Sequence, residues 1–356
     1  MPRPSHTFEF SVADLMRRMA APCVGVALLA ALVHAASLCR ILPSPVPSDL
    51  DRTILESKTR LASRTSPVSV LLLGDSSCMM DVDALELAHR LDRPVLNLGT
   101  LSYLDVSAHA ALLRHTLRHL PSPPTDIVLL VHPGSLLRST SLPDLERFLR
   151  ARLDQDSVRA RSSARHATEA LLGGVIVREQ LVQPWIPSRL RGEFATAYGT
   201  TWQVQRQLER QAGTLLDPSH FDPSAVPGRY EFQLHARLET ASREFRSAIP
   251  PTSRFWVGLT PLPESLALPQ HATRIQAVLE GWSAWLGSVR ILPTDSGALS
   301  ADASSVASAS QGIPGTLPDR FFATVTHLNA DGVAHFTARL ATELLTPRAG
   351  PTPGPP

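Results

Sequence analysis

Short apolar runs alternate with segments of helical periodicity along most of the chain. The apolar runs are four to seven residues long and lie at 68–73, 94–98, 126–131, 254–260 and 289–292. Nearly uninterrupted runs of this length are typical of strands in a parallel sheet that is covered on both faces. Helical spacing occurs in 82–91, 108–120, 275–286 and from 331 onward. Because strands that alternate with helices form parallel sheets with right-handed crossovers, the pattern predicts an α/β fold.

The longest apolar stretch lies near the N-terminus. Residues 19–39 contain no charged side chain, Arg17 and Arg18 precede them, and Arg40 follows. About 20 apolar residues suffice for a transmembrane helix, and flanking arginines favour the cytoplasmic side. We therefore predict a signal anchor at 19–40, with 1–18 in the cytoplasm and the rest of the chain outside it. A cleaved signal peptide and a buried soluble helix are the alternatives.

Changes in composition divide the remaining chain. Residues 41–66 are rich in Pro and Ser and predict a partly extended linker before a domain at 67–345. Within that domain the Arg-rich stretch 139–253 interrupts the strand-helix rhythm and predicts a helical insertion, which can be a cap or a mere decoration. The Pro- and Gly-rich tail 346–356 is predicted to be disordered.

Charge and cysteine content narrow the function. The formal net charge is +2, from 34 basic and 32 acidic residues, which gives no electrostatic case for a nucleic-acid partner. Three cysteines are too few for a disulfide scaffold or a multi-cysteine zinc site. No Gly-rich loop follows a predicted strand, which argues against a dinucleotide site. We expect neither a cofactor nor a metal ion.

Two polar segments stand where a parallel sheet would place a site. The sequence Gly74-Asp75-Ser76-Ser77 follows the first predicted strand directly, and His327 precedes the last helix. Ligands of open α/β sheets bind at the carboxyl ends of the strands. A serine there can act as a nucleophile if a histidine takes its proton. The sequence therefore predicts that Ser76 and His327 meet at this edge.

Three segments resemble the SGNH/GDSL hydrolase superfamily, namely GDSS at 74–77, NLGT at 97–100 and THLNADG at 326–332. The resemblance covers roughly 68–135 and 254–345. It implies a three-layer α/β/α fold with a parallel flavodoxin-like sheet and an activity on esters. It also implies Ser76 as the nucleophile, His327 as the base, and the backbone amides of Gly99 and Ser76 as oxyanion donors.

The sequence departs from the family pattern at two places. The last family block is D-x-x-H, but Thr324 stands three residues before His327, and Asp319 is the nearest acidic residue that can substitute. The third block carries an asparagine after the third strand, where this chain has His132-Pro133-Gly134-Ser135. Either His132 or Ser135 can donate to an oxyanion in its place. Because one lost oxyanion donor costs about 3–4 kcal/mol in the barrier, these departures bear directly on activity.

Two functions remain open at this point. The first is a serine esterase or O-acyltransferase, anchored in the cytoplasmic (inner) membrane with its domain outside the cytoplasm. The anchor makes the layout similar to family members of envelope polysaccharide acylation, which implies an acyl-ester or glycan substrate and a membrane acyltransferase as partner. The second is a degenerate SGNH-like module that binds glycan or docks such an acyltransferase without catalysis.

Overall fold

The computed structural model describes residues 12–38, 50–137, 142–155, 198–199, 201–222, 234–266, 271–287, 289–292 and 315–346. The chain divides into two compact units. One comprises 1–46 with 157–185, and the other comprises 47–156 with 186–356. The predicted tail beyond Thr346 and most of the centre of the predicted insertion lie outside the described residues.

In the first unit, the described residues form helix α1 (Val12–Leu38). This helix contains nearly all of the uncharged stretch that predicts the anchor. Within the described parts of the chain, however, no helix is long and apolar enough to span a bilayer. The anchor at 19–40 therefore stays a prediction.

The second unit is built on a parallel sheet, to which the described residues contribute five strands. In spatial order these are β2 (Val95–Asn97), β1 (Val70–Gly74), β3 (Asp126–Val131), β4 (Arg254–Leu259) and β6 (Arg290–Ile291), and every neighbouring pair is parallel. The predicted α/β class with a parallel sheet is thus confirmed. A separate parallel pair joins β5 (Leu262–Pro263) and β7 (Thr316–Leu317).

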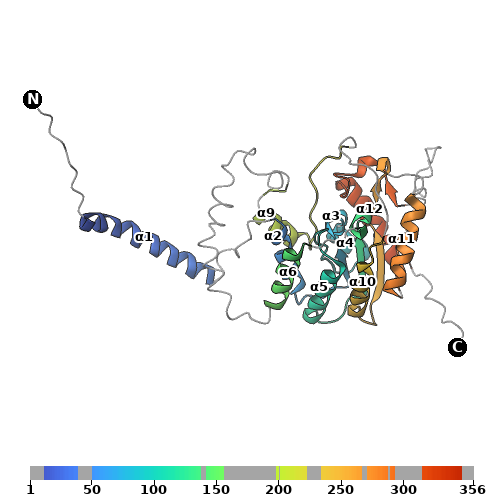
Figure 1. Ribbon diagram of the computed structural model, residues 1–356, viewed down its shortest axis with the longest axis horizontal. Helices are drawn as coiled ribbons and strands as arrows, with labels where there is room; N and C mark the ends of the chain where they lie inside the picture. The colour runs from blue at the N-terminus through green and yellow to red at the C-terminus, as the bar shows by residue number, and fades with distance from the viewer. Residues whose placement is uncertain are drawn as a thin grey trace, which may run out of the picture. The chain divides into compact units, whose positions relative to one another are not determined.

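Helices connect the strands and cover both faces of the sheet (Figure 1). The α-helices of this unit are α2 (Leu50–Ala62), α3 (Ser76–Asp81), α4 (Ala84–Leu91), α5 (Val106–His119), α6 (Pro143–Gln155), α9 (Thr201–Arg210), α10 (Arg237–Ala248), α11 (His271–Leu286) and α12 (Ala330–Leu345). Short 3-10 turns lie at η1 (Pro133–Leu137), η7 (Glu264–Leu266) and η9 (Asp319–Phe321).

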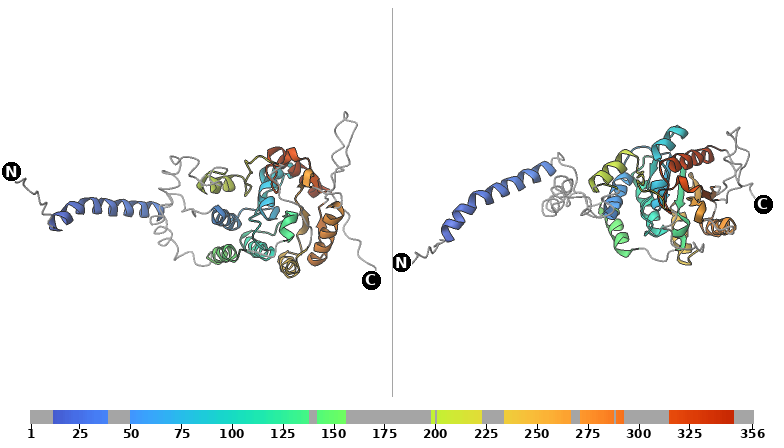
Figure 2. Two further views of the ribbon diagram at one scale, coloured as in Figure 1. Left: turned by 45° about the horizontal axis from the view of Figure 1, so that its top comes forward. Right: turned by 90° about the horizontal axis from the view of Figure 1, so that it is seen from above.

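Strand β1 shows how the two faces arise. Successive side chains of a strand point to opposite sides, so an all-apolar strand must be buried twice. Leu71 and Leu73 belong to a core that includes residues of α2, α5, α10 and α11. Val70 and Leu72 belong to a second core with residues of α4 and α12. The two further views show these helices on either side of the sheet (Figure 2).

Two predicted segments differ from the structure. Residues 50–62 of the predicted linker form α2, with Ile54, Leu55 and Leu61 fully buried, because apolar side chains recur on one face of this otherwise polar segment. Within the predicted insertion, α10 packs against α5 and α11 and belongs to the helical layer over the sheet. The described part of the insertion is therefore more than a cap or a decoration.

Candidate active site

The loop after β1 places Ser76 at the carboxyl edge of the sheet. Asp75 is the N-cap of α3, and its carboxylate accepts hydrogen bonds from the backbone N–H groups of Ser77 and Cys78. Gly74 has φ +148°, and a Cβ at this position would lie 1.6 Å from the carbonyl oxygen of Leu130. Only glycine permits so close an approach of two backbones. The turn thus presents Ser76 as the first residue of α3.

Helix α3 also holds the loop that carries His327. The Ser77 hydroxyl donates to the Thr326 carbonyl at 2.8 Å, and the Asp81 carboxylate accepts from the Leu328 N–H at 2.8 Å. These two bonds flank His327 on both sides along the chain. A helix that starts with the serine therefore fixes the backbone of the histidine, although some 250 residues separate them in sequence.

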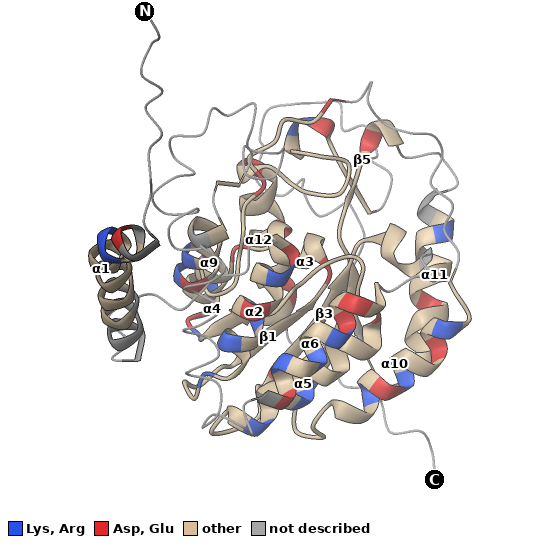
Figure 3. Ribbon diagram, turned by 60° about the vertical axis from the view of Figure 1, so that its left-hand side comes forward, with Lys and Arg blue, Asp and Glu red and all other residues tan. Residues whose placement is uncertain are grey.

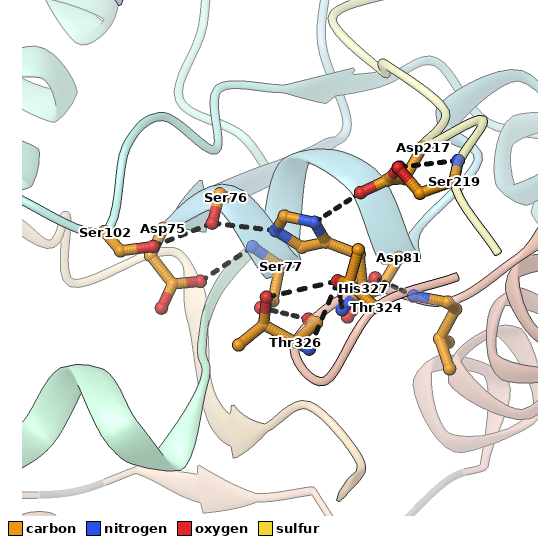
Figure 4. Close-up of polar contacts among 11 residues, drawn as sticks. Asp75, Ser76, Ser77, Asp81, Ser102, Asp217, Ser219, Thr324, Thr326 and His327 are labelled. Atoms are coloured by element: carbon orange, nitrogen blue, oxygen red, sulfur yellow. Dashed lines mark hydrogen bonds and ion pairs between the residues drawn. The ribbon is translucent and has the colours of Figure 1, made fainter. Parts of the chain in front are cut away.

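Ser76, His327 and Asp217 form one continuous hydrogen-bonded chain (Figure 4). The Ser76 Oγ lies 3.0 Å from Nε2 of His327, and Nδ1 of the same ring lies 2.7 Å from Oδ2 of Asp217. The first distance is within the range required for direct proton transfer. The second lets a carboxylate fix the imidazole tautomer and stabilise the imidazolium. The structure thus brings Ser76 and His327 together and adds a carboxylate that the sequence analysis missed.

Asp217 is held as a charged group. Burial alone would raise the pKa of this carboxyl, but hydrogen bonds from His327 and Ser219 outweigh burial and lower the pKa to about 2. The Ser219 N–H donates to Oδ1 at 2.9 Å, which leaves Oδ2 for the imidazole. The Asp217 side chain is 1 % exposed, so its charge is little screened by water at the ring.

Ser102 approaches the Ser76 hydroxyl from the side opposite to the imidazole (Figure 4). Its Oγ lies 2.7 Å from the Ser76 Oγ. This residue follows the NLGT segment, on the loop between β2 and α5. A hydroxyl at this distance can donate to the neighbouring oxygen when that oxygen carries negative charge.

Gly99, one of the two oxyanion donors that the resemblance implies, does not fit that role. Its N–H donates to Oδ1 of Asn97 at 2.9 Å, so the amide is already engaged inside the protein. A Cβ at Gly99 would lie 2.5 Å from the backbone nitrogen of Met79. The glycine is therefore explained by close packing of its loop on α3, and the resemblance misassigns its role.

His132 and Ser135 contact Asp75 instead of the Ser76 hydroxyl. The His132 N–H and the Ser135 hydroxyl both donate to Oδ2 of Asp75, at 2.8 and 2.5 Å. Burial raises the pKa of Asp75, and these bonds oppose that effect. The segment after β3 thus ties the nucleophile turn to the neighbouring strand, and these bonds do not place either residue as a donor to a substrate oxyanion.

The two candidates for the missing acidic residue have other roles. The Thr324 hydroxyl accepts from the N–H groups of Thr326 and His327 at 3.3 and 3.1 Å and so closes the tight turn before the histidine. Asp319 accepts from the Ser265 N–H at 3.0 Å. Since Nδ1 of His327 is bound by Asp217, the expectation that Asp319 substitutes for the family's aspartate is wrong.

Neither Asp217 nor Ser102 carries a sequence signal of its own. Asp217 lies in LLDPSH, where Asp-Pro indicates only a turn, and Ser102 lies in an ordinary polar loop. The only local feature is that Asp217 is an acidic residue, followed two positions later by Ser219, in a stretch otherwise rich in arginine. This feature does not identify a catalytic carboxylate. Comparison with protein-family models and with curated proteins found no match.

Proposed function

We propose that the protein is a serine esterase or O-acyltransferase that works through an acyl-Ser76 intermediate. The observation that carries this proposal is the chain of hydrogen bonds from Asp217 through His327 to Ser76. Nucleophile, base and orienting carboxylate are recognised by their mutual geometry, whatever their order along the chain.

The reaction has two half-reactions. In the first, the Ser76 Oγ attacks the acyl carbonyl while Nε2 of His327 takes its proton, and the same nitrogen then protonates the departing alkoxide. In the second, His327 takes a proton from water or from a sugar hydroxyl, whose oxygen attacks the acyl-serine and releases Ser76. Asp217 stays ionised throughout and stabilises the imidazolium formed in each half. The acceptor, water or sugar, decides between hydrolysis and transfer.

The finer family assignment is part of this proposal. The strands of the sheet lie in the order β2-β1-β3-β4-β6. If these five strands are numbered one to five along the chain, the order is 2-1-3-4-5, which is the flavodoxin-like order of doubly wound folds. With the GDSS and THLNADG segments, it supports an SGNH-type domain in which Asp217 supplies the carboxylate that D-x-x-H normally carries. Envelope glycans as substrate, a membrane acyltransferase as partner, and an inner-membrane location rest on the resemblance and on residues 19–39 alone.

The degenerate-module hypothesis keeps one supporting observation. The Gly99 amide is engaged by Asn97, and the His132 N–H and the Ser135 hydroxyl donate to Asp75, so these three groups are already occupied within the protein. The other argument for this hypothesis was the missing aspartate of the D-x-x-H block, and Asp217 supplies a carboxylate to His327 in its place. We therefore favour the enzyme, and we propose that the Ser102 hydroxyl, 2.7 Å from the Ser76 Oγ, turns from that atom to the oxygen of the tetrahedral intermediate.

Active-site labelling tests the proposal. The full chain is incubated with a fluorophosphonate probe, and covalent attachment is measured by intact mass. We expect one adduct per chain, none in Ser76→Ala, and unchanged labelling in Ser283→Ala, which removes a hydroxyl on α11 that donates only to the Glu280 carbonyl among its described contacts. Equal labelling of wild type and Ser76→Ala would refute the acyl-serine mechanism, as would a folded wild type that takes no label.

A further inference from the structure

Lys58, the only lysine of the sequence, is buried where the end of β2 meets the segment that leads to Asp217. It is on α2, its side chain is 0 % exposed, and it forms no ion pair with the described acidic residues. Its ammonium donates to the backbone carbonyl of Asn97 at 3.0 Å and to that of Gly213 at 2.5 Å. Burying a charge without a counter-ion is costly, so this arrangement calls for an explanation beyond packing.

The two carbonyls belong to the two loops that complete the site. Asn97 ends β2, and the chain runs from it to Ser102. Gly213 belongs to a segment, residues 211–219, that we call the Asp217 loop. The two loops also touch directly, because the Asn97 N–H donates to the Ala212 carbonyl at 2.9 Å. One ammonium therefore joins the loop of Ser102 to the loop of Asp217.

The Asp217 loop has a second anchor, on the nucleophile side. The Thr214 hydroxyl donates to the Val82 carbonyl and accepts from the Ala84 N–H, while the Leu215 N–H donates to the Met79 carbonyl. These contacts fix the stretch between Gly213 and Asp217 against α3 and the start of α4. The loop before the carboxylate is thus held by hydrogen bonds to backbone groups on both of its sides, and Lys58 supplies the only side-chain cation among these contacts in the described structure.

We propose that Lys58 is a positioning residue for the triad of Ser76, His327 and Asp217. It holds the Asp217 loop against the end of β2, so that the Asp217 carboxylate reaches the His327 ring. This inference rests on the proposed function, since it assigns Lys58 a role in the same chemistry. It extends that function to a helix that contributes no group to the site itself.

The protonation state of Lys58 does not decide the contact. Burial lowers the pKa of this amine to about 7, an effect that the neighbouring Cys78 thiol partly opposes. The thiol is itself buried, and burial raises its pKa. A neutral amine still has two N–H groups, one for each carbonyl. The bridge between the loops therefore persists on both sides of neutral pH.

The test compares Lys58→Met, which keeps an unbranched side chain one atom shorter and removes the donors, with Leu55→Ala, which weakens the packing of the same helix but touches neither loop carbonyl. Two quantities are measured on the full chain, the low-field proton NMR signal of His327 Nδ1–H and the rate of fluorophosphonate labelling at Ser76. We expect Lys58→Met to shift or abolish the signal and to slow labelling about 10–100-fold, since displacements near 1 Å cost about this much. Leu55→Ala should keep both near wild type.

The outcomes separate this inference from the function on which it rests. A folded Lys58→Met with an unchanged signal and rate overturns the positioning role, and so does an equal loss in Leu55→Ala. If Asp217→Asn labels at the wild-type rate, the triad function fails, while the NMR signal still reports whether Lys58 places the carboxylate. Should Lys58→Met not fold, Lys58→Gln retains a buried N–H donor and is expected to give an intermediate loss, and wild-type behaviour in that variant also counts against the proposal.

Discussion

At the scale of single residues, the site combines a recognisable serine and histidine with a carboxylate from an unremarkable segment. Ser76 and His327 could be predicted because each stands in a motif next to a predicted element. Asp217 could not, since its place is set by Lys58, Thr214 and the backbone of β2, all distant in sequence. A side chain placed by long-range contacts leaves no local pattern to find.

Replacing the carboxylate tests its role most directly. Asp217→Asn keeps the size of the side chain but removes the charge that fixes the imidazole tautomer, so we expect the labelling rate at Ser76 to fall by about 10³–10⁴. Asp319→Asn is the matched control, because that carboxylate contacts Ser265 and should leave the rate unchanged. If Asp319→Asn slows labelling as much as Asp217→Asn does, Asp319 contributes to catalysis, as expected from the sequence, and the role of Asp217 is not specific.

Asp81 offers a test of stability that is separate from catalysis. Burial raises the pKa of this carboxyl well above its usual value, and Oδ2 has no hydrogen-bond partner among the described residues. The folded state therefore binds a proton that the unfolded state releases, so stability falls as the pH rises above the unfolded pKa toward the folded one. Asp81→Asn keeps an acceptor for the Leu328 N–H and carries no charge.

We expect urea denaturation to show that Asp81→Asn gains stability relative to wild type as the pH rises from 4 to 8, by about 1–3 kcal/mol. Ser57→Ala, which removes a buried hydroxyl that donates to the Thr53 carbonyl, is the comparison, because that variant alters stability without removing a titratable group. A difference between Asp81→Asn and wild type that is flat across the pH range would show that Asp81 is ionised in the folded state.

At the scale of elements, the strands were easier to predict than the helices that surround them. β3 has the bounds that its apolar run predicted, whereas β1 begins two residues after the predicted start at 68 and ends one residue further than predicted, at Gly74. The predicted linker included α2, because prolines precede residue 50 and because the segment is polar on average although one of its faces is buried. A strand that is buried twice must be apolar throughout, whereas a helix buried on one side carries a weaker signal.

The turn before Asp217 makes a prediction at this scale. Gly213 has φ +97°, and a Cβ there would lie 1.8 Å from the carbonyl oxygen of Asn97. Gly287 also has a positive φ, +73°, but its nearest neighbour, Nε of Arg246, lies 3.8 Å away. Gly287→Ala therefore meets backbone strain alone, about 1–2 kcal/mol, whereas Gly213→Ala adds a steric clash.

We expect Gly213→Ala to lower the urea midpoint further than Gly287→Ala and, unlike it, to slow labelling of Ser76. Both variants are compared at a temperature where each remains folded. Equal midpoints and wild-type labelling in Gly213→Ala would mean that the Asp217 loop does not depend on its contact with β2.

At the scale of the whole molecule, charge is distributed rather than concentrated. Basic and acidic positions are interspersed along α6 and α10 (Figure 3), with ion pairs such as Arg150–Glu146 and Arg243–Glu239 along the helices and Arg114–Glu244 between α5 and α10. Exposed pairs of this kind add little stability, but they leave no single-sign field over these helices. Long-range electrostatic attraction over α6 and α10 therefore contributes little to recognition of a substrate.

The division of the chain into two units leads to the last prediction. Ser76, Ser102, Asp217 and His327 all belong to the unit formed by 47–156 and 186–356, whereas α1 belongs to the other. A chain that starts at Pro47 should therefore label at Ser76 at the same rate as the full chain and unfold at the same urea midpoint.

Alkaline carbonate extraction of cell membranes measures the separate role of residues 1–46. If these residues form the predicted anchor, the full chain stays in the membrane pellet and the shortened chain is found in the supernatant. Slower labelling of the shortened chain would show that residues 1–46 contribute to the site, and release of the full chain by carbonate would contradict the anchor while leaving the acyl-serine mechanism intact.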